Sequence, residues 1–389
     1  MIGALLTINN CVREFIRRSP VGVSEKDAPF LTSQEEEFNE LALSVARVQI
    51  PLNPLLKVLC EKRKIDPSRL KHWTEIPTMP TSAFKTSECS CLAAKDLTTI
   101  FHSSGTTGQT ASRHGHNSET LATYETSMVP WFKYHLCGDD TKRLIFLSLT
   151  PVPSDAPYSS LAHMMATVMR RCGAGEGQFT GAVDFHKAWV LDVQRTVKAL
   201  EAAVEENQPV VVLGTAFSFV HFVDHLREGR MRFALPAGSR VMETGGYKGR
   251  SRTMPKTELH QLITRWLGVP QTSIVCEYGM CELSSQAYDG RYTSISATEP
   301  HKKERAFHFP PWARVCIVSP EDGREVGEGE TGLIRVCDIA NIGSSIMVQT
   351  EDLGIKRGSG FEFVGRAAES EPRGCSLMSE AEFHLANFL

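Results

Sequence analysis

Between residues 97 and 288, short apolar runs alternate with segments of helical periodicity, and this alternation constrains the fold more than any other feature. The runs at 143–149 and 209–214 are continuous and mainly apolar, which is typical of strands buried on both faces. The segment 190–203, which lies between them, has a helical pattern. Strands that alternate with helices predict an α/β fold with largely buried sheets flanked by helices.

The two ends of the chain differ from this central part. The first 90 residues have a mainly helical pattern, in which Ser33, followed by acidic residues, is typical of a helix start. Beyond residue 290, two strand-like segments at 313–318 and 332–336 are joined by the turn-rich sequence EDGREVGEGE, which predicts a β-hairpin. We expect a large domain (1–365) made of a helical part (1–90), an α/β part (91–290) and a smaller β-rich part (291–365), followed by a short tail (366–389).

Composition and charge argue against several classes of protein. The 389 residues are 41% hydrophobic and 22% charged, as in ordinary globular enzymes. A formal charge of −3 and the lack of a basic stripe predict no nucleic-acid partner. No apolar stretch reaches the roughly 18 residues that a membrane span needs, and the N-terminus lacks signal-peptide features. The eleven cysteines have no Cys-x-x-Cys spacing, so we expect reduced thiols, no zinc and a cytoplasmic location.

A run rich in serine, threonine and glycine follows a short apolar segment at 97–101. Glycines that flank paired threonines allow backbone N–H groups and hydroxyls to converge on one point, which suits a polyphosphate. The run is not a P-loop, because Gly-x4-Gly-Lys-[Ser/Thr] does not occur in the chain. Taken alone, it is equally compatible with a polar surface turn. The candidate phosphate ligands are Ser104, Gly105, Thr106, Thr107 and Gly108.

Two segments far downstream fit the same chemistry. They are ETGGYKGR at 243–250 and EYGMCEL at 277–283, the second of which follows a strand-like run. In this order and spacing, the three segments resemble the nucleotide-binding motifs of the adenylate-forming (acyl-CoA synthetase-like) superfamily. The stretches SSGTTGQTASRH, VVVLGTAF, EYGMCELSSQAY and GRAAESEPRGCSL more closely resemble the LuxE-type acyl-protein synthetases, which activate fatty acids for bacterial luminescence. The resemblance extends over roughly residues 70 to 380.

This resemblance implies ATP and Mg²⁺ as cofactors and gives individual residues a role. The serine, threonine and glycine run would wrap the phosphates, and Glu282 would be the magnesium ligand, since a carboxylate is a hard oxygen donor. Asp352 would hold the ribose hydroxyls with the help of Arg366. The residues implied on the adenine side are Gly245, Gly246, Tyr247, Tyr278 and Gly279.

The chain departs from the superfamily pattern in three places. Cys281 stands where the superfamily prefers threonine, and a thiol is a weak donor to phosphate. The lysine that usually follows the phosphate loop is missing, and Arg113 is the cation that could replace it. Finally, the usual C-terminal domain of about a hundred residues is reduced to the tail 366–389, which is too short for an independent domain.

Cys375 lies in this tail, in the sequence Arg-Gly-Cys-Ser, where a neighbouring arginine favours the thiolate. A cysteine near a terminus can be incidental. In the LuxE-type family, however, the cysteine in this context receives the acyl group from acyl-AMP as a thioester. The resemblance therefore implies an enzyme that carries its own acyl acceptor and delivers the acyl group to a partner such as an acyl reductase.

Two other functions remain open at the level of sequence. One is a ligase that adenylates an aromatic or other acid and passes it to coenzyme A or another small nucleophile. The other is a non-catalytic subunit that binds a reductase, which Cys281 and the missing lysine favour. A stable acyl-enzyme would distinguish the leading interpretation from the first alternative. Acid-dependent ATP–pyrophosphate exchange would distinguish it from the second.

Overall fold

The computed structural model describes residues 2–22, 28–86, 89–103, 110–138, 144–175, 177–245, 254–292 and 305–367. Its α-helices are α1 (Ile2–Arg18), α2 (Ala28–Leu52), α3 (Pro54–Arg63), α4 (Ser118–Phe132), α5 (Ser160–Cys172), α6 (Val193–Glu205), α7 (Ala216–Glu228) and α8 (Lys256–Leu267). Its strands are β1 (Met79–Pro80), β2 (Thr99–His102), β3 (Arg113–His116), β4 (Ile145–Ser148), β5 (Gln178–Phe179), β6 (Gly181–Val183), β7 (Trp189–Leu191), β8 (Val210–Thr215), β9 (Arg240–Thr244), β10 (Ile274–Tyr278), β11 (Ala287–Tyr288), β12 (Ala313–Val318), β13 (Thr331–Asp338), β14 (Met347–Arg357) and β15 (Gly360–Arg366).

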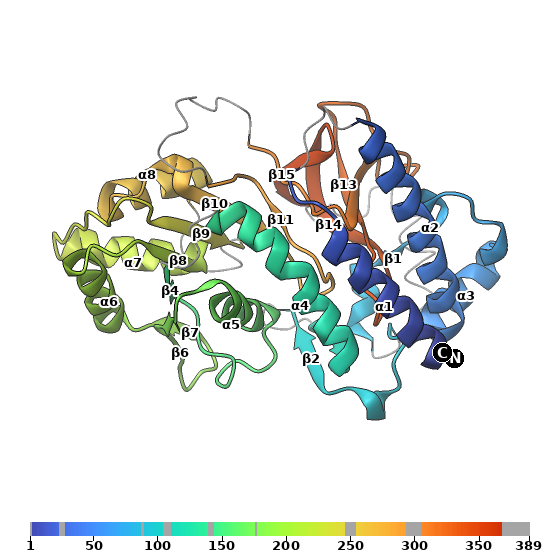
Figure 1. Ribbon diagram of the computed structural model, residues 1–389, viewed down its shortest axis with the longest axis horizontal. Helices are drawn as coiled ribbons and strands as arrows, with labels where there is room; N and C mark the ends of the chain where they lie inside the picture. Colours follow the sequence, from blue (N-terminus) through green and yellow to red (C-terminus); the bar gives the residue numbers. More distant parts are fainter. Residues whose placement is uncertain are drawn as a thin grey trace.

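A six-stranded sheet forms one half of the molecule (Figure 1). Its strand order is β11-β10-β9-β8-β4-β5, and every pair is parallel except β10 with β11. One face packs against α6, α7 and α8 through side chains such as Val212, Leu200 and Ile263. The other face packs against α4 and α5, where Met242 shares a core with Phe132. Both faces are covered, which explains why most residues of these strands are apolar.

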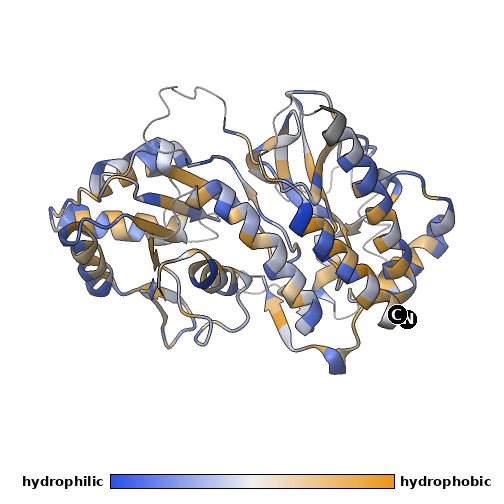
Figure 2. Cartoon of the chain, in the orientation of Figure 1, coloured by the Kyte–Doolittle hydropathy of each residue, from blue (hydrophilic) through white to orange (hydrophobic). Residues whose placement is uncertain are grey.

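A five-stranded sheet forms the other half, next to the N-terminal helices α1, α2 and α3 (Figure 1). Its order is β1-β14-β13-β12, and β15 also pairs with β14. The short strand β1 pairs in parallel with β14, which links the N-terminal part of the chain to the C-terminal part. Figure 2 shows hydrophobic residues on the strands and on the inner sides of the helices, while the outer helix faces are hydrophilic.

The structure confirms the α/β alternation and the β-hairpin, which β12 and β13 form. Two expected boundaries were wrong. Ser33 lies inside α2, because this helix already begins at Ala28, with a proline in the first turn, where proline is tolerated. Val190 belongs to β7, and helix α6 begins only after Asp192, whose side chain caps it by accepting a hydrogen bond from the N–H of Arg195. Among the described residues, no helix is both long and apolar enough to cross a membrane.

Candidate functional site

Tyr278 lies at the carboxyl end of β10, where parallel sheets usually bind ligands. Its ring is enclosed by other aromatic rings, with the centroid of Phe361 at 5.2 Å and that of Phe363 at 5.7 Å. Its hydroxyl donates a hydrogen bond of 2.9 Å to Oδ2 of Asp352. Burial, together with this carboxylate, raises the pKa of Tyr278 well above its ordinary value, so the hydroxyl keeps its proton and acts as a donor.

Asp352 comes from the second sheet, on β14, and lies directly opposite Arg366 of β15. The Nε atom of Arg366 is 3.7 Å from Oδ1 of Asp352. The arginine side chain is 67% exposed and the aspartate side chain 16%, so the cation has room to move toward a ligand. The structure thus joins Tyr278, Asp352 and Arg366 across two sheets, and we call them the Tyr–Asp–Arg cluster.

The turn after β10 carries Cys281 and Glu282, both of which are buried. The Cys281 thiol donates a hydrogen bond of 3.2 Å to Oε2 of Glu282. The main chain here is fixed by two side chains: Asn341 donates to the carbonyl of Glu282 at 2.9 Å, and Nδ1 of His114 contacts the carbonyl of Cys281 at 2.7 Å. Burial lowers the pKa of His114 to about 4, so the ring is neutral and we assign the proton to Nδ1. Ser344 contacts the other ring nitrogen at 3.1 Å.

The donor set around Glu282 fits magnesium better than a transition metal. Among the described residues, no three His, Cys, Asp or Glu side chains surround a common metal position. Magnesium is usually held by one or two carboxylates, together with substrate phosphates and water. Glu282 offers one buried carboxylate, which matches that arrangement.

Some of the other residues predicted from the sequence lie within the described part of the structure. Arg113 is exposed and begins β3, just after the predicted phosphate loop. Gly245 has a φ of +73°, a left-handed conformation that favours glycine. At Gly279, a Cβ atom would lie too close to the Glu277 carboxylate, so a larger residue would require that side chain to move. Outside the described residues lie Ser104, Gly105, Thr106, Thr107, Gly108, Gly246, Tyr247 and Cys375.

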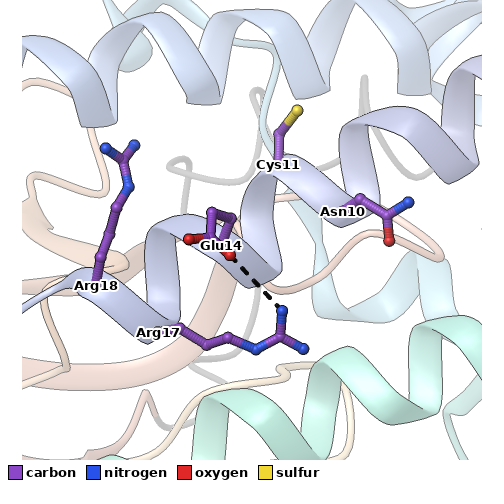
Figure 3. Close-up of a pocket in the computed structure, with 5 residues that line it drawn as sticks. All are labelled: Asn10, Cys11, Glu14, Arg17 and Arg18. Atoms are coloured by element: carbon purple, nitrogen blue, oxygen red, sulfur yellow. Dashed lines mark ion pairs between the residues drawn. The ribbon is translucent and has the colours of Figure 1, made fainter.

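A surface hollow along α1 is a separate feature (Figure 3). It contains none of the residues predicted from the sequence, and in it Arg17 pairs with Glu14 at 3.8 Å on the same helix. Its lining residues are Asn10, Cys11, Glu14, Arg17 and Arg18.

Comparison with known sequences identifies the family. The model of the family described as "Acyl-protein synthetase, LuxE" matches residues 25–383. The chain belongs to this family. A curated relative is the long-chain-fatty-acid–luciferin-component ligase of Aliivibrio fischeri, which is 22% identical over 315 residues, covering 78% of this chain and 77% of the relative.

Solved structures confirm the fold of this LuxE-family chain. An open conformation of 2-hydroxyisobutyryl-CoA ligase, in complex with 2-HIB-AMP and CoA, has a TM-score of 0.59 at 11% identity, covering 85% of this chain and 70% of that one. The same ligase in its postadenylation state has a TM-score of 0.60 at 13% identity, with coverages of 87% and 70%. The LuxE-family chain therefore has the adenylate-forming fold. It is an acyl-protein ligase, an enzyme that activates an acid with ATP as acyl-AMP.

Replacing Cys281 with threonine should preserve or increase the exchange of pyrophosphate into ATP in this LuxE-family enzyme. A hydroxyl is a better hydrogen-bond donor than a thiol, both to a phosphate oxygen and to the Glu282 carboxylate that Cys281 already contacts. The measurement is the acid-dependent exchange rate of the two proteins at equal concentration, with Cys281→Ala as a control that has neither donor. A large loss of exchange in the threonine variant would mean that the thiol itself has a role.

Proposed function

We propose that this enzyme activates a fatty acid as acyl-AMP, transfers the acyl group to its own Cys375 and delivers it from that thioester to an acyl reductase in the cytoplasm. In this proposal, residues 1–365 form the adenylating domain and residues 366–389 the tail that carries the acceptor. ATP is consumed to AMP and pyrophosphate. The reductase and the cytoplasmic location follow from the family resemblance and the cysteine pattern.

The Tyr–Asp–Arg cluster is the observation that carries the nucleotide site. Asp352 presents a carboxylate that can accept hydrogen bonds from both ribose hydroxyls. The Tyr278 hydroxyl donates a hydrogen bond to Oδ2 of this carboxylate and so fixes its orientation. The rings around Tyr278 provide an apolar surface for a base. Arg366 adds a positive charge that is free to approach a phosphate, since most of its side chain is exposed. A base, a sugar and a phosphate therefore each have a partner of matching chemistry.

The chemistry would proceed in two steps. In the first, a carboxylate oxygen of the acid attacks the α-phosphorus of ATP, the bond from this phosphorus to the β-phosphate oxygen breaks, and pyrophosphate leaves. In the second, the Cys375 thiolate attacks the acyl carbon, the bond from this carbon to the AMP oxygen breaks, and AMP leaves. The proton that forms the thiolate is released to solvent. The first step requires the acid oxygen to lie in line with the leaving pyrophosphate, and the second requires the thiolate to reach the face of the acyl carbonyl group.

Glu282 would hold Mg²⁺ together with the phosphates. When bound, the ion neutralises charge on the triphosphate and its leaving group. The role of the protein is to keep this carboxylate in place, and His114 and Asn341 do so by fixing the main chain on either side of it. Arg113, at the edge of the predicted phosphate loop, would be the additional cation.

The proposal is tested by acid-dependent ATP–pyrophosphate exchange over a panel of fatty and aromatic acids, followed by intact-mass measurement of the protein. Exchange with fatty acids and an added acyl mass are expected. Exchange without a covalent adduct, with product formed only when coenzyme A is added, would instead favour a coenzyme A ligase. No exchange with any acid would favour the non-catalytic subunit.

Replacing Asp352 with alanine should raise the KM for ATP at least tenfold and leave the KM for the acid nearly unchanged. The variant loses the acceptor for the ribose hydroxyls, and hydrogen bonds to a charged group contribute about 1.5–3 kcal/mol each. Glu362→Ala, on the neighbouring strand β15, is a matched control that should keep the parent KM. An unchanged KM for ATP in folded Asp352→Ala would remove this residue from the nucleotide site.

A further inference from the structure

At the carboxyl ends of the parallel strands in the six-stranded sheet, four neighbouring strands carry polar side chains on the same face. Thr215 of β8 is in register with Thr244 of β9, Thr244 with Glu277 of β10, and Glu277 with Tyr288 of β11. We call these four residues the polar row. The row directly beneath it is apolar, because Leu213 pairs with Met242 and Met242 with Val275. This is the sheet face that packs against α4 and α5.

Glu277 is the unusual member of the polar row. Only 5% of its surface is exposed, and the hydroxyl of Thr244 donates a hydrogen bond to its Oε2. Among the described residues, no cation influences this carboxyl group. Burial raises the pKa of Glu277 to about 7, so near neutral pH the carboxyl can both donate and accept hydrogen bonds. A hydroxyl group has the same dual capacity.

Tyr288 provides an independent sign that a polar ligand belongs here. The residue is fully buried, and among the described residues its hydroxyl has no hydrogen-bond partner. A buried hydroxyl without a partner costs free energy, and native proteins rarely leave one unless water or a ligand completes it. Glu277 and Tyr288 are directly opposite each other in the β10–β11 pair, so their side chains leave the sheet on the same face.

The polar row is well placed to meet the acid rather than the nucleotide. Tyr278 and Glu277 are consecutive on a strand, so their side chains point to opposite faces of the sheet. Tyr278 points to the Tyr–Asp–Arg cluster, where we place the nucleotide, and Glu277 points toward α4 and α5. An in-line reaction needs the acid to approach the α-phosphorus opposite the leaving pyrophosphate. An acid held on the face that carries Glu277 would approach this strand end from the side opposite Tyr278.

We propose, as a refinement that rests on the proposed function, that Glu277 and Thr244 contact the acid next to its carboxyl group and select hydroxy acids over unsubstituted acids. The hydroxyl, on the second or third carbon, would exchange hydrogen bonds with the Glu277 carboxyl. An unsubstituted acid would leave that buried carboxyl without a partner on this side. Sites built to bind a hydroxyl discriminate strongly against analogues that lack it.

The test compares kcat/KM in pyrophosphate exchange for length-matched acids from butanoic to hexadecanoic acid, each with its 2-hydroxy, 3-hydroxy and 2-amino derivative. We expect the parent enzyme to prefer a hydroxy acid at least tenfold over the unsubstituted acid. Glu277→Leu should reduce this ratio to about one and leave the KM for ATP unchanged. If Glu277 had only a structural role, Glu277→Leu would keep the parent ratio of kcat/KM between hydroxy and unsubstituted acids. Glu362→Gln, an acid on β15 that pairs with Arg357, should keep the parent ratio.

Glu277→Gln and Thr244→Val provide the test if the leucine variant does not fold. Glutamine keeps an acceptor and should keep most of the preference, whereas Thr244→Val removes the donor that holds the carboxyl and should weaken it. Equal activity of the parent enzyme with hydroxy and unsubstituted acids would overturn this inference alone, as would a preference for amino acids or an unchanged ratio in Glu277→Leu. No exchange with any acid would overturn the proposed function together with it.

Discussion

Replacing Glu282 with glutamine is expected to lower magnesium-dependent adenylation at least a hundredfold in a folded protein. The amide keeps the size of the side chain and an acceptor for the Cys281 thiol, so the turn after β10 should persist. The amide lacks the negative charge that holds a divalent cation, and the loss of charge stabilisation at the phosphates costs several kcal/mol of barrier. The measurement is pyrophosphate exchange across a titration of magnesium chloride.

Two controls accompany this variant. Its thermal unfolding midpoint should stay near that of the parent enzyme, and Glu362→Gln, an acid on β15, should keep the parent magnesium dependence. Acyl-AMP formation at the parent rate and the parent magnesium requirement would remove Glu282 from the metal site.

Cys375→Ser is expected to retain exchange near the parent level and to lose all thiol-labile labelling by radioactive fatty acid. Every nucleotide residue inferred here precedes residue 367, so adenylation should proceed without the thiol. Serine is a far weaker nucleophile at neutral pH, because the thiolate and not the neutral group attacks the acyl carbon. The measurement is acyl-enzyme recovered after gel filtration, with and without hydroxylamine.

Cys11→Ser is the matched control for this experiment, because Cys11 is an exposed thiol far from the predicted acceptor in sequence. It should label like the parent enzyme. If Cys375→Ser still accumulates the same thioester, the acceptor is another of the eleven cysteines. Loss of exchange itself in folded Cys375→Ser would mean that the tail helps to complete the adenylation site.

The strands were easier to predict than the ends of the helices. The apolar run that contains β8 identifies a buried strand, because a sheet covered on both faces favours apolar residues on both sides of each strand. The sequence predicts the start of α2 at Ser33, five residues too late, since a serine followed by acidic residues also occurs inside a helix. Capping patterns are local, and packing against the rest of the molecule decides where a helix begins.

In the candidate site, too, some residues can be predicted from the sequence and others cannot. Tyr278, Asp352 and Arg366 were reached through the family resemblance, and the structure brings them together across two sheets. His114 fixes the turn that carries Glu282, a role that the sequence alone does not indicate. The sequence does not predict the polar row, because the register that aligns Thr244 with Glu277 follows from strand pairing and has no signal in the linear sequence.

Strand β15 leads straight from the Tyr–Asp–Arg cluster into the tail, and this has a kinetic consequence. The N–H of Ala367 still bonds to the carbonyl of Glu351, next to Asp352. Cys375 follows eight residues later, so even a fully extended chain keeps its sulfur within about 30 Å of that anchor. A tether of this length gives an effective concentration in the millimolar range. Acyl transfer to Cys375 would then be a first-order event, whose rate does not depend on how much enzyme or free thiol is present.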